Sequence, residues 1–413
     1  ASLSLRRYAN REGIVQASHA LLLAQQLSAD AARCARCEAI LGDACNELFE
    51  YRGATRHFQL ALAHAGRPIP QHQLTLVLDL GWQLMVQLTS FVGLRRPVSQ
   101  DPWLPWASHI HEKLGEIAYF DAGTLPLLHA TLTSLNLAER SGTVREAVDG
   151  LAALAIGFYG AGQHWLSRIY NRRSLKLAEE KGGMADIAYA HLVNGVYRAA
   201  QGHWGPAEQS LHQSVVLYTS LGAVERWQQA FGGLCAIALI RGQFDQARGW
   251  LDKLRPAKRD MPVQIAVYLH AFDACIAMAT GEDLAASIAH LQTVVLAQEL
   301  AQFDRVLCQG LLAAAYWQLD QRKAAVDMAL AGLATLAGRV PAAWYVTDGL
   351  AGIAQTLIDA HAHGMLGLTE ARNACHLFSR YGRATRVAAP RAALLQGRLA
   401  MAEGRDRLAR KHW

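Results

Sequence analysis

The sequence predicts an all-α protein built as a solenoid of antiparallel helix pairs, and three observations support this prediction. The chain has 413 residues, 52% apolar and 18% charged, which suits an elongated array better than one compact core. Its apolar residues are mainly Ala and Leu, and its 11 prolines cluster between the periodic segments. Patterns of small and large residues also recur along the chain, as repeat architectures require.

The first helix pair is indicated by Leu41 and Gly42 on one helix and by Ala54, Phe58 and Ala61 on the next. This is the spacing of a tetratricopeptide unit, in which small residues lie where two helices cross and large residues fill the gap beside them. The same spacing indicates further units at Leu114-Gly115, Leu154-Ala155, Gly195 with Leu211, Cys235 with Leu251, 281–286, 320–325 and Arg391 to Gly404. The prediction is a right-handed superhelix of tetratricopeptide-like pairs, with an irregular helical bundle as the alternative.

Two proline-containing stretches interrupt the array. Residues 66–70 and 95–105 hold five prolines between them, and the residue before a proline disfavours helical geometry. The apolar helix expected from Leu74 to Val92 does not fit the repeat spacing. We therefore expect a short N-terminal sub-array over 1–92, a Pro/Trp-rich join over 93–108, and a longer array over 109–413 whose last helix pair is consistent with truncation.

The formal net charge of +6 is concentrated at one end of the chain. Residues 380–413 hold nine basic side chains against Glu403 and Asp406, which leaves 31 basic and 32 acidic residues elsewhere. A nearly neutral body disfavours a long phosphate-binding track, so nucleic acid is not the expected partner. Whether the C-terminal arginines bind anything is left open.

Cysteine usage and hydropathy bear on the compartment. The seven cysteines are odd in number and widely scattered, and no secretory leader is recognised, which together favour a reducing, cytoplasmic location. No apolar stretch is judged to approach the roughly 18 to 20 residues that span a bilayer, so no membrane association is expected.

Motifs that would carry catalysis, a metal or a cofactor are not recognised. There is no phosphate loop of the form G-x4-G-K-[ST], and Lys181-Gly182-Gly183 is better explained as a helix C-cap. Metal-like spacings occur at Cys34-x2-Cys37, His109-x-His111 and His361-x-His363, but histidines two apart on a helix point to different faces. We therefore predict no catalytic, cofactor-binding or metal-binding residue, and no enzyme activity in this chain.

A partner-binding face is predicted instead, on the first helix of each pair, which lines the concave side of tetratricopeptide arrays. Carboxylates, a few aromatic rings and one arginine would suit a polar or mildly basic partner. An ordinary solvated surface is an equally open alternative. The residues projected onto this face are Arg36, Asp43, Asn46, His109, Glu112, Glu116, Tyr119, Asp149, Tyr159, Tyr189 and Gln229.

Three stretches carry a more specific resemblance: 7–23, 51–70 (YRGATRHFQLALAHAGRPIP) and 112–142 (EKLGEIAYFDAGTLPLLHATLTSLNLAERSG). They resemble the C-terminal helical-repeat region of large bacterial class III adenylate/guanylate cyclases that carry a central AAA/STAND-type ATPase module. The resemblance implies the regulatory tail of a multi-domain signalling protein, with any cyclase or ATPase activity in domains upstream. It carries no catalytic residue over, because no position here matches those motifs.

These observations leave several function classes open. The leading hypothesis is an interaction and regulatory module for signal transduction that binds a protein, a peptide or sister domains of its own polypeptide. The alternative is a small-molecule sensor domain of a STAND-type regulator, suggested by the aromatic residues Trp103, Trp106, Tyr119, Tyr159 and Trp165. A helical enzyme with converging carboxylates and histidines is the weakest option. The partner's identity and the oligomeric state are not determined by the sequence.

Overall fold

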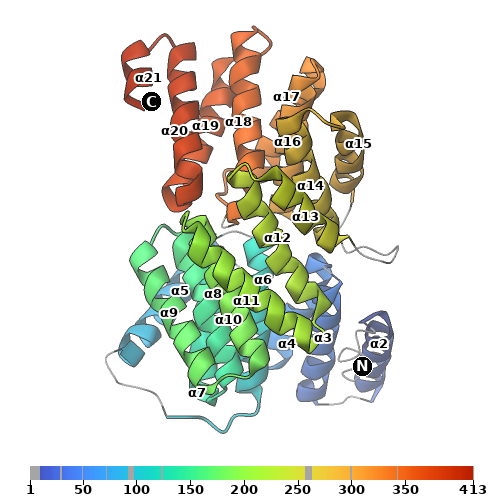
Figure 1. Cartoon of the computed structure of the whole chain (residues 1–413). Coiled ribbons are helices and arrows are strands. Elements are labelled where there is room, and N and C mark those ends of the chain that lie inside the picture. Colours follow the sequence, from blue (N-terminus) through green and yellow to red (C-terminus); the bar gives the residue numbers. More distant parts are fainter. Residues whose placement is uncertain are drawn as a thin grey trace. The chain divides into compact units, whose positions relative to one another are not determined.

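The computed structural model is entirely helical across the residues it describes (Figure 1). Those residues are 10–27, 30–48, 50–70, 72–91, 97–121, 124–255, 263–297, 300–341 and 343–412. Within these ranges there are twenty α-helices and two short 3-10 turns, and consecutive helices pair with one another. The all-α prediction and the pairing of sequential helices are thus confirmed.

The chain divides into two compact units, each described here by itself. Unit 1 comprises 1–157 and 167–186, and unit 2 comprises 158–166 and 187–413. The predicted join over 93–108 falls within unit 1, and its residues 93–96 lie outside the described ranges. The helices of unit 1 are α2 (Asn10–Gln26), α3 (Ala31–Glu47), α4 (Tyr51–His64), α5 (Gln73–Phe91), α6 (Trp103–Asp121), α7 (Thr124–Ser141), most of α8 (Val144–Gly160) and most of α9 (His164–Lys181).

Unit 2 continues the series of paired helices. Its first part holds α10 (Met184–Ala200), α11 (Trp204–Leu221), α12 (Val224–Ile240), α13 (Phe244–Leu254), α14 (Val263–Thr280) and α15 (Leu284–Val295). Its second part holds α16 (Gln302–Gln318), α17 (Arg322–Leu336), η1 (Trp344–Val346), α18 (Thr347–Ala362), α19 (Leu368–Ala384), η2 (Arg386–Ala388), α20 (Ala389–Ala402) and α21 (Asp406–His412).

Glycines on first helices bring the paired helices close together. In each case the glycine faces a larger side chain 16 residues later, and an added Cβ would come 2.5 to 2.8 Å from it. Such a distance is too short for a real contact, so only glycine fits without displacing its neighbour. The three pairs are Gly42 with Phe58, Gly115 with Thr131 and Gly195 with Leu211. The residues that predicted the repeat are therefore the ones that make the helix crossings.

The turns inside the pairs recur with a period of 40 residues. Gly162, Gly202 and Gly242 all adopt positive φ, between 70° and 79°, and each ends the first helix of its pair. Helices of 17 and 18 residues alternate from α8 to α11, which accounts for a period longer than the 34 of a standard tetratricopeptide. The spacing within a pair is tetratricopeptide-like, whereas the period between pairs is longer.

One expectation from hydropathy is wrong. Helix α14 has 18 residues with a mean hydropathy of 1.4, so by length and composition it is apolar enough to cross a bilayer. The helix packs against α12, α13, α15 and α16 within unit 2, and 56% of it is buried. Its apolar residues are spread round the helix because several neighbours surround it, as in a core helix.

Candidate binding site

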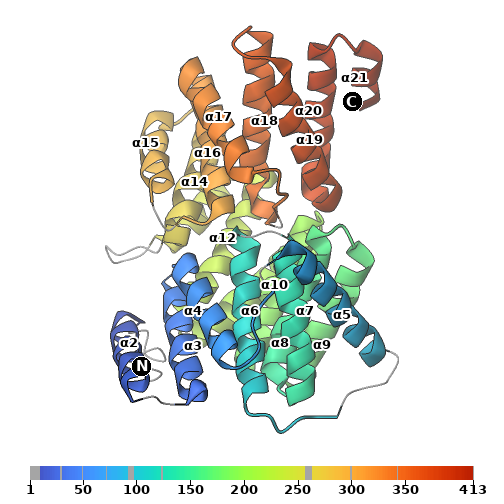
Figure 2. The same ribbon diagram turned by 180° about the vertical axis from the view of Figure 1, so that it is seen from behind.

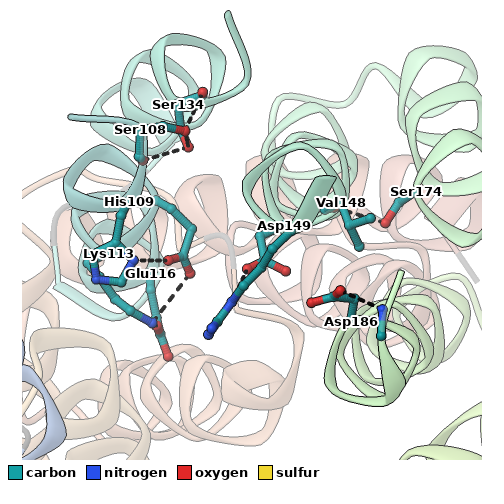
Figure 3. Close-up of polar contacts among 12 residues, drawn as sticks. Ser108, His109, Lys113, Glu116, Ser134, Val148, Asp149, Ser174 and Asp186 are labelled. Carbon is teal, nitrogen blue, oxygen red and sulfur yellow. Dashed lines mark hydrogen bonds and ion pairs between the residues drawn. The ribbon is translucent and has the colours of Figure 1, made fainter. Parts of the chain in front are cut away.

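Unit 1 brings together five of the residues projected onto the partner face. They are Asp43 on α3, His109, Glu112 and Glu116 on α6, and Asp149 on α8. The three residues of α6 share one face because they lie three or four positions apart, one helical turn each. Figure 3 shows the α6 residues grouped on one side and Asp149 on the neighbouring helix. We call these five residues and Lys113 the charged cluster.

Buried serine hydrogen bonds fix the helices that carry the cluster. Ser108 Oγ donates to the carbonyl of Ser134 at 2.8 Å, and Ser174 Oγ donates to the carbonyl of Val148 at 3.0 Å (Figure 3). These bonds join α6 to α7 and α8 to α9 at positions 40 residues apart. His109 and Asp149 each follow the residue that is held in this way, so they occupy equivalent positions in consecutive repeats.

His109 links α3 to α6. Its Nε2 lies 2.8 Å from Oδ1 of Asp43, and its Nδ1 lies 3.7 Å from Oε2 of Glu112. Burial lowers the pKa of His109, but the charge and hydrogen bond of Asp43 and the charge of Glu112 outweigh it, so the pKa is raised overall. The protonated ring can donate to carboxylates on both sides, which favours an imidazolium at this position.

Lys113 lies between two carboxylates of its own helix and is a member of the cluster that the sequence did not identify. Its Nζ is 3.1 Å from Oε2 of Glu116 and 3.5 Å from Oε1 of Glu112. Lys113 and Glu112 are both buried, although lysine and glutamate rarely are unless paired. The three-residue spacing from Lys113 to Glu116 was the available signal, but spacing alone does not distinguish a buried pair from a solvated one.

Asp149 is the group with the most perturbed acidity in the cluster. Its side chain is 13% exposed, and burial together with the charges of Glu112 and Asp186 raises the pKa of its carboxyl to about 8. Arg145, whose Nε is 4.0 Å away, and Lys113 oppose this shift. The carboxyl is therefore mostly protonated at neutral pH and can donate a hydrogen bond until a nearby positive charge favours its ionisation.

Three other predicted residues of unit 1 surround the cluster. Arg36 is exposed, and its guanidinium carbon lies 5.9 Å from the centre of the Trp103 ring. Asn46 is buried, with no hydrogen-bond partner for its Oδ1 among the described residues. Tyr119 is half-buried with its ring edge against Phe120.

The remaining three predicted residues belong to unit 2 and are not part of the cluster. Tyr189 and Gln229 are half-buried, and Arg226 lies 5.8 Å from the centre of the Tyr189 ring. Tyr159 is 1% exposed, and its hydroxyl donates to the carbonyl of Ala200 at 2.5 Å. Tyr159 was projected onto the surface, but its ring is buried because α8 ends against unit 2 at this point.

A second histidine site lies on the other face of α6. His129 Nε2 is 2.7 Å from Oδ2 of Asp79, and His111 lies beside His129 with ring centres 6.2 Å apart. Burial and the neighbouring charges of His129 and Arg67 lower the pKa of His111 to about 3, which keeps its ring neutral. His109 and His111 thus point to different sides of α6, as their spacing predicted.

Metal chemistry finds no support in the described part of the chain. No group of three or more His, Cys, Asp or Glu side chains there is arranged to hold a metal ion. Cys34 is buried and Cys37 is half-buried on α3, and burial with the nearby Cys34 and Glu38 raises the pKa of Cys37. A raised thiol pKa disfavours the thiolate that a metal or a nucleophile needs.

Several C-terminal arginines are engaged in ion pairs within unit 2. Arg391 pairs with Asp348, and Arg398 pairs with Asp359 at 2.5 Å. Arg405 lies 3.2 Å from Glu403. These contacts neutralise part of the basic end that the sequence showed.

Comparison with known proteins identifies no family. No family model matches the chain, and no curated protein matches it. The resemblance to the cyclase-associated repeat region therefore rests on its three sequence segments. The fold itself is an all-α arrangement of paired consecutive helices, consistent with a helical repeat.

Proposed function

We propose that the chain is an interaction and regulatory module, a right-handed superhelix of tetratricopeptide-like pairs from a cytoplasmic bacterial signalling protein of the cyclase/ATPase type. The charged cluster is the observation that carries this proposal. Buried ion pairs contribute little net stability because desolvation offsets their attraction. A network of this kind on equivalent positions of successive first helices is therefore better explained by recognition than by stability.

The chemistry of the cluster favours a cationic partner segment. Four carboxyl groups, those of Asp43, Glu112, Glu116 and Asp149, are opposed by His109 and Lys113. A lysine or arginine from a peptide, or from a sister domain, would compensate the excess carboxylates. Its charge would also lower the pKa of Asp149, so binding would be coupled to release of a proton.

This proposal predicts binding that depends on pH and on charge. Fluorescence anisotropy of the whole chain with an oligo-arginine peptide should show affinity that rises as the pH increases toward about 8, because Asp149 must ionise. An oligo-glutamate peptide of equal length should not bind. The variants Asp149→Asn and Glu116→Gln should each weaken oligo-arginine binding by about fivefold to tenfold.

The matched control is Asp245→Asn, which removes the same charge from a fully exposed position on α13. Equal losses for Asp245→Asn and Asp149→Asn would indicate non-specific attraction and contradict the proposal. Turnover of ATP or GTP by the purified chain would contradict the expectation that it is not an enzyme.

A small-molecule sensor is the second candidate, favoured by a cavity of about 720 Å³ in unit 1. Its volume is in the range of ligand sites, which are usually lined by apolar side chains. The lining here includes Trp82 but also Arg140, Arg173 and Lys181, and it contains none of the five aromatic residues named from the sequence. Quenching of tryptophan fluorescence by a small anion that is lost in Trp82→Phe would favour the sensor over the peptide-binding module.

A further inference from the structure

Helix α5 is amphipathic with its polar side turned inward. Asp79 binds His129, and Asn136 Nδ2 donates to Oε1 of Gln83 at 2.7 Å. One turn later, Gln87 Nε2 donates to Oδ1 of Asn136 at 2.6 Å. These contacts hold α5 against α7, and Figure 2 shows α5 lying across that helix. The polar residues of α5 are therefore used within unit 1.

The opposite side of α5 is an apolar stripe that nothing in the described chain covers. Its side chains are between 48% and 72% exposed, although a surface helix normally turns such residues toward the core. They follow one another at three- or four-residue steps along the whole helix. The residues of this α5 stripe are Leu74, Val77, Leu78, Trp82, Met85 and Leu88.

The spacing of the stripe fits another helix. Positions 74, 78, 81, 85 and 88 alternate steps of four and three residues, which is the heptad pattern of a helix–helix seam. At the centre of this series is Gly81, and no atom lies within 4 Å of the position its Cβ would take. A second helix can thus approach closely at Gly81 and pack beside Trp82.

The size of the stripe is close to what a specific association requires. Its six side chains leave roughly 700 Å² of apolar surface exposed, and a stable interface buries about 800 Å² on each partner. Exposed apolar patches of this size on a monomer usually mark an interaction site.

The charges on α5 favour a second copy of the same chain as the occupant. The helix has no Lys or Arg, and its one acidic residue, Asp79, is turned toward His129. A membrane-surface helix needs basic residues beside its apolar face, and a selective partner helix would be chosen by flanking charges. Neither feature is present, whereas two identical uncharged stripes meet without repulsion.

The order of residues in the stripe also suits a two-fold arrangement. Leu74 and Leu88 each lie seven positions from Gly81. An antiparallel copy with its Gly81 opposite this one brings each Leu74 near the Leu88 of the other chain and pairs opposite helix dipole ends. We propose that the chain self-associates through antiparallel pairing of α5 from two copies.

Sedimentation equilibrium of the whole chain tests the proposal. The parent chain is expected to dimerise, and the double variant Leu78→Glu/Met85→Glu should raise the dimer dissociation constant by at least about tenfold. The control is Val216→Glu, an apolar-to-acidic change at an isolated exposed position of α11, which should leave dimerisation unchanged. Circular dichroism checks that each variant keeps its helical content.

Cysteine cross-linking tests the orientation independently of stability. Mixing Leu74→Cys with Leu88→Cys chains under mild oxidation should give a cross-linked dimer, whereas Leu74→Cys alone should not. A parent chain that remains monomeric, or a dimer unaffected by Leu78→Glu/Met85→Glu, would overturn the proposal. So would a monomer that binds anionic phospholipid vesicles through the stripe.

Discussion

At the scale of single residues, acidity is set by neighbours on other helices. Asp149 lies on α8, but burial against unit 1 and the charge of Glu112 on α6 hold its pKa at about 8. A carboxyl with a raised folded-state pKa stabilises the folded chain least at high pH. Stability from this group is intact below the unfolded value of about 4 and declines as the pH rises to about 8.

Replacing Asp149 should therefore change how stability depends on pH. Asp149→Asn should raise the free energy of unfolding at about pH 8 by on the order of 1–3 kcal/mol, with little effect near pH 4. Urea unfolding followed by circular dichroism at both values measures this. Asp245→Asn, at an exposed site, should give equal small changes at the two values, and an Asp149→Asn chain with the parent's pH dependence would show that the carboxyl is not perturbed.

At the scale of helices, glycine sets how closely two elements approach. Where α16 crosses α18, a Cβ on Gly310 would fall against the backbone of Gly349, and one on Gly349 would come 2.5 Å from Cα of Leu307. Backbone atoms cannot rotate away as a side chain can. This crossing is consequently less tolerant of a methyl group than the pair formed by Gly42 and the Phe58 ring.

The crossing gives a prediction of opposite sign for two glycine substitutions. Gly310→Ala should destabilise unit 2 by about 1–3 kcal/mol because α16 and α18 must separate. Gly249→Ala, in a helix with open space around the new methyl group, should stabilise the chain by up to about 1 kcal/mol. Urea midpoints measure both effects, and two shifts of the same sign would refute the close crossing.

At the scale of the whole molecule, the chain is a series of similar helix pairs with one exception. The turns at Gly162, Gly202 and Gly242 keep a 40-residue period, whereas α5 stands outside it. In repeat arrays each pair depends chiefly on its neighbours, so the loss of a terminal element is borne locally.

Removing the last helix should therefore leave the rest folded. A chain ending at Gly404 lacks α21, in which Ala409 is the only residue recorded as buried. Its urea transition should shift by no more than about 1–2 kcal/mol, and helical content should fall in proportion to the residues removed. Collapse of the circular dichroism signal would show instead that α21 is integral to the core of unit 2.

The sequence by itself determined the helical class, the pairing of neighbouring helices and the shared face of His109, Glu112 and Glu116. These follow from local spacing: Gly42 and Phe58 are close enough in the chain for one helix pair to place them together. Only the tertiary structure decided that Asp43 meets His109, that Asp149 faces Glu112, and that α5 buries its polar side. Such contacts depend on the register between helices from different repeats, which no periodicity within one helix specifies.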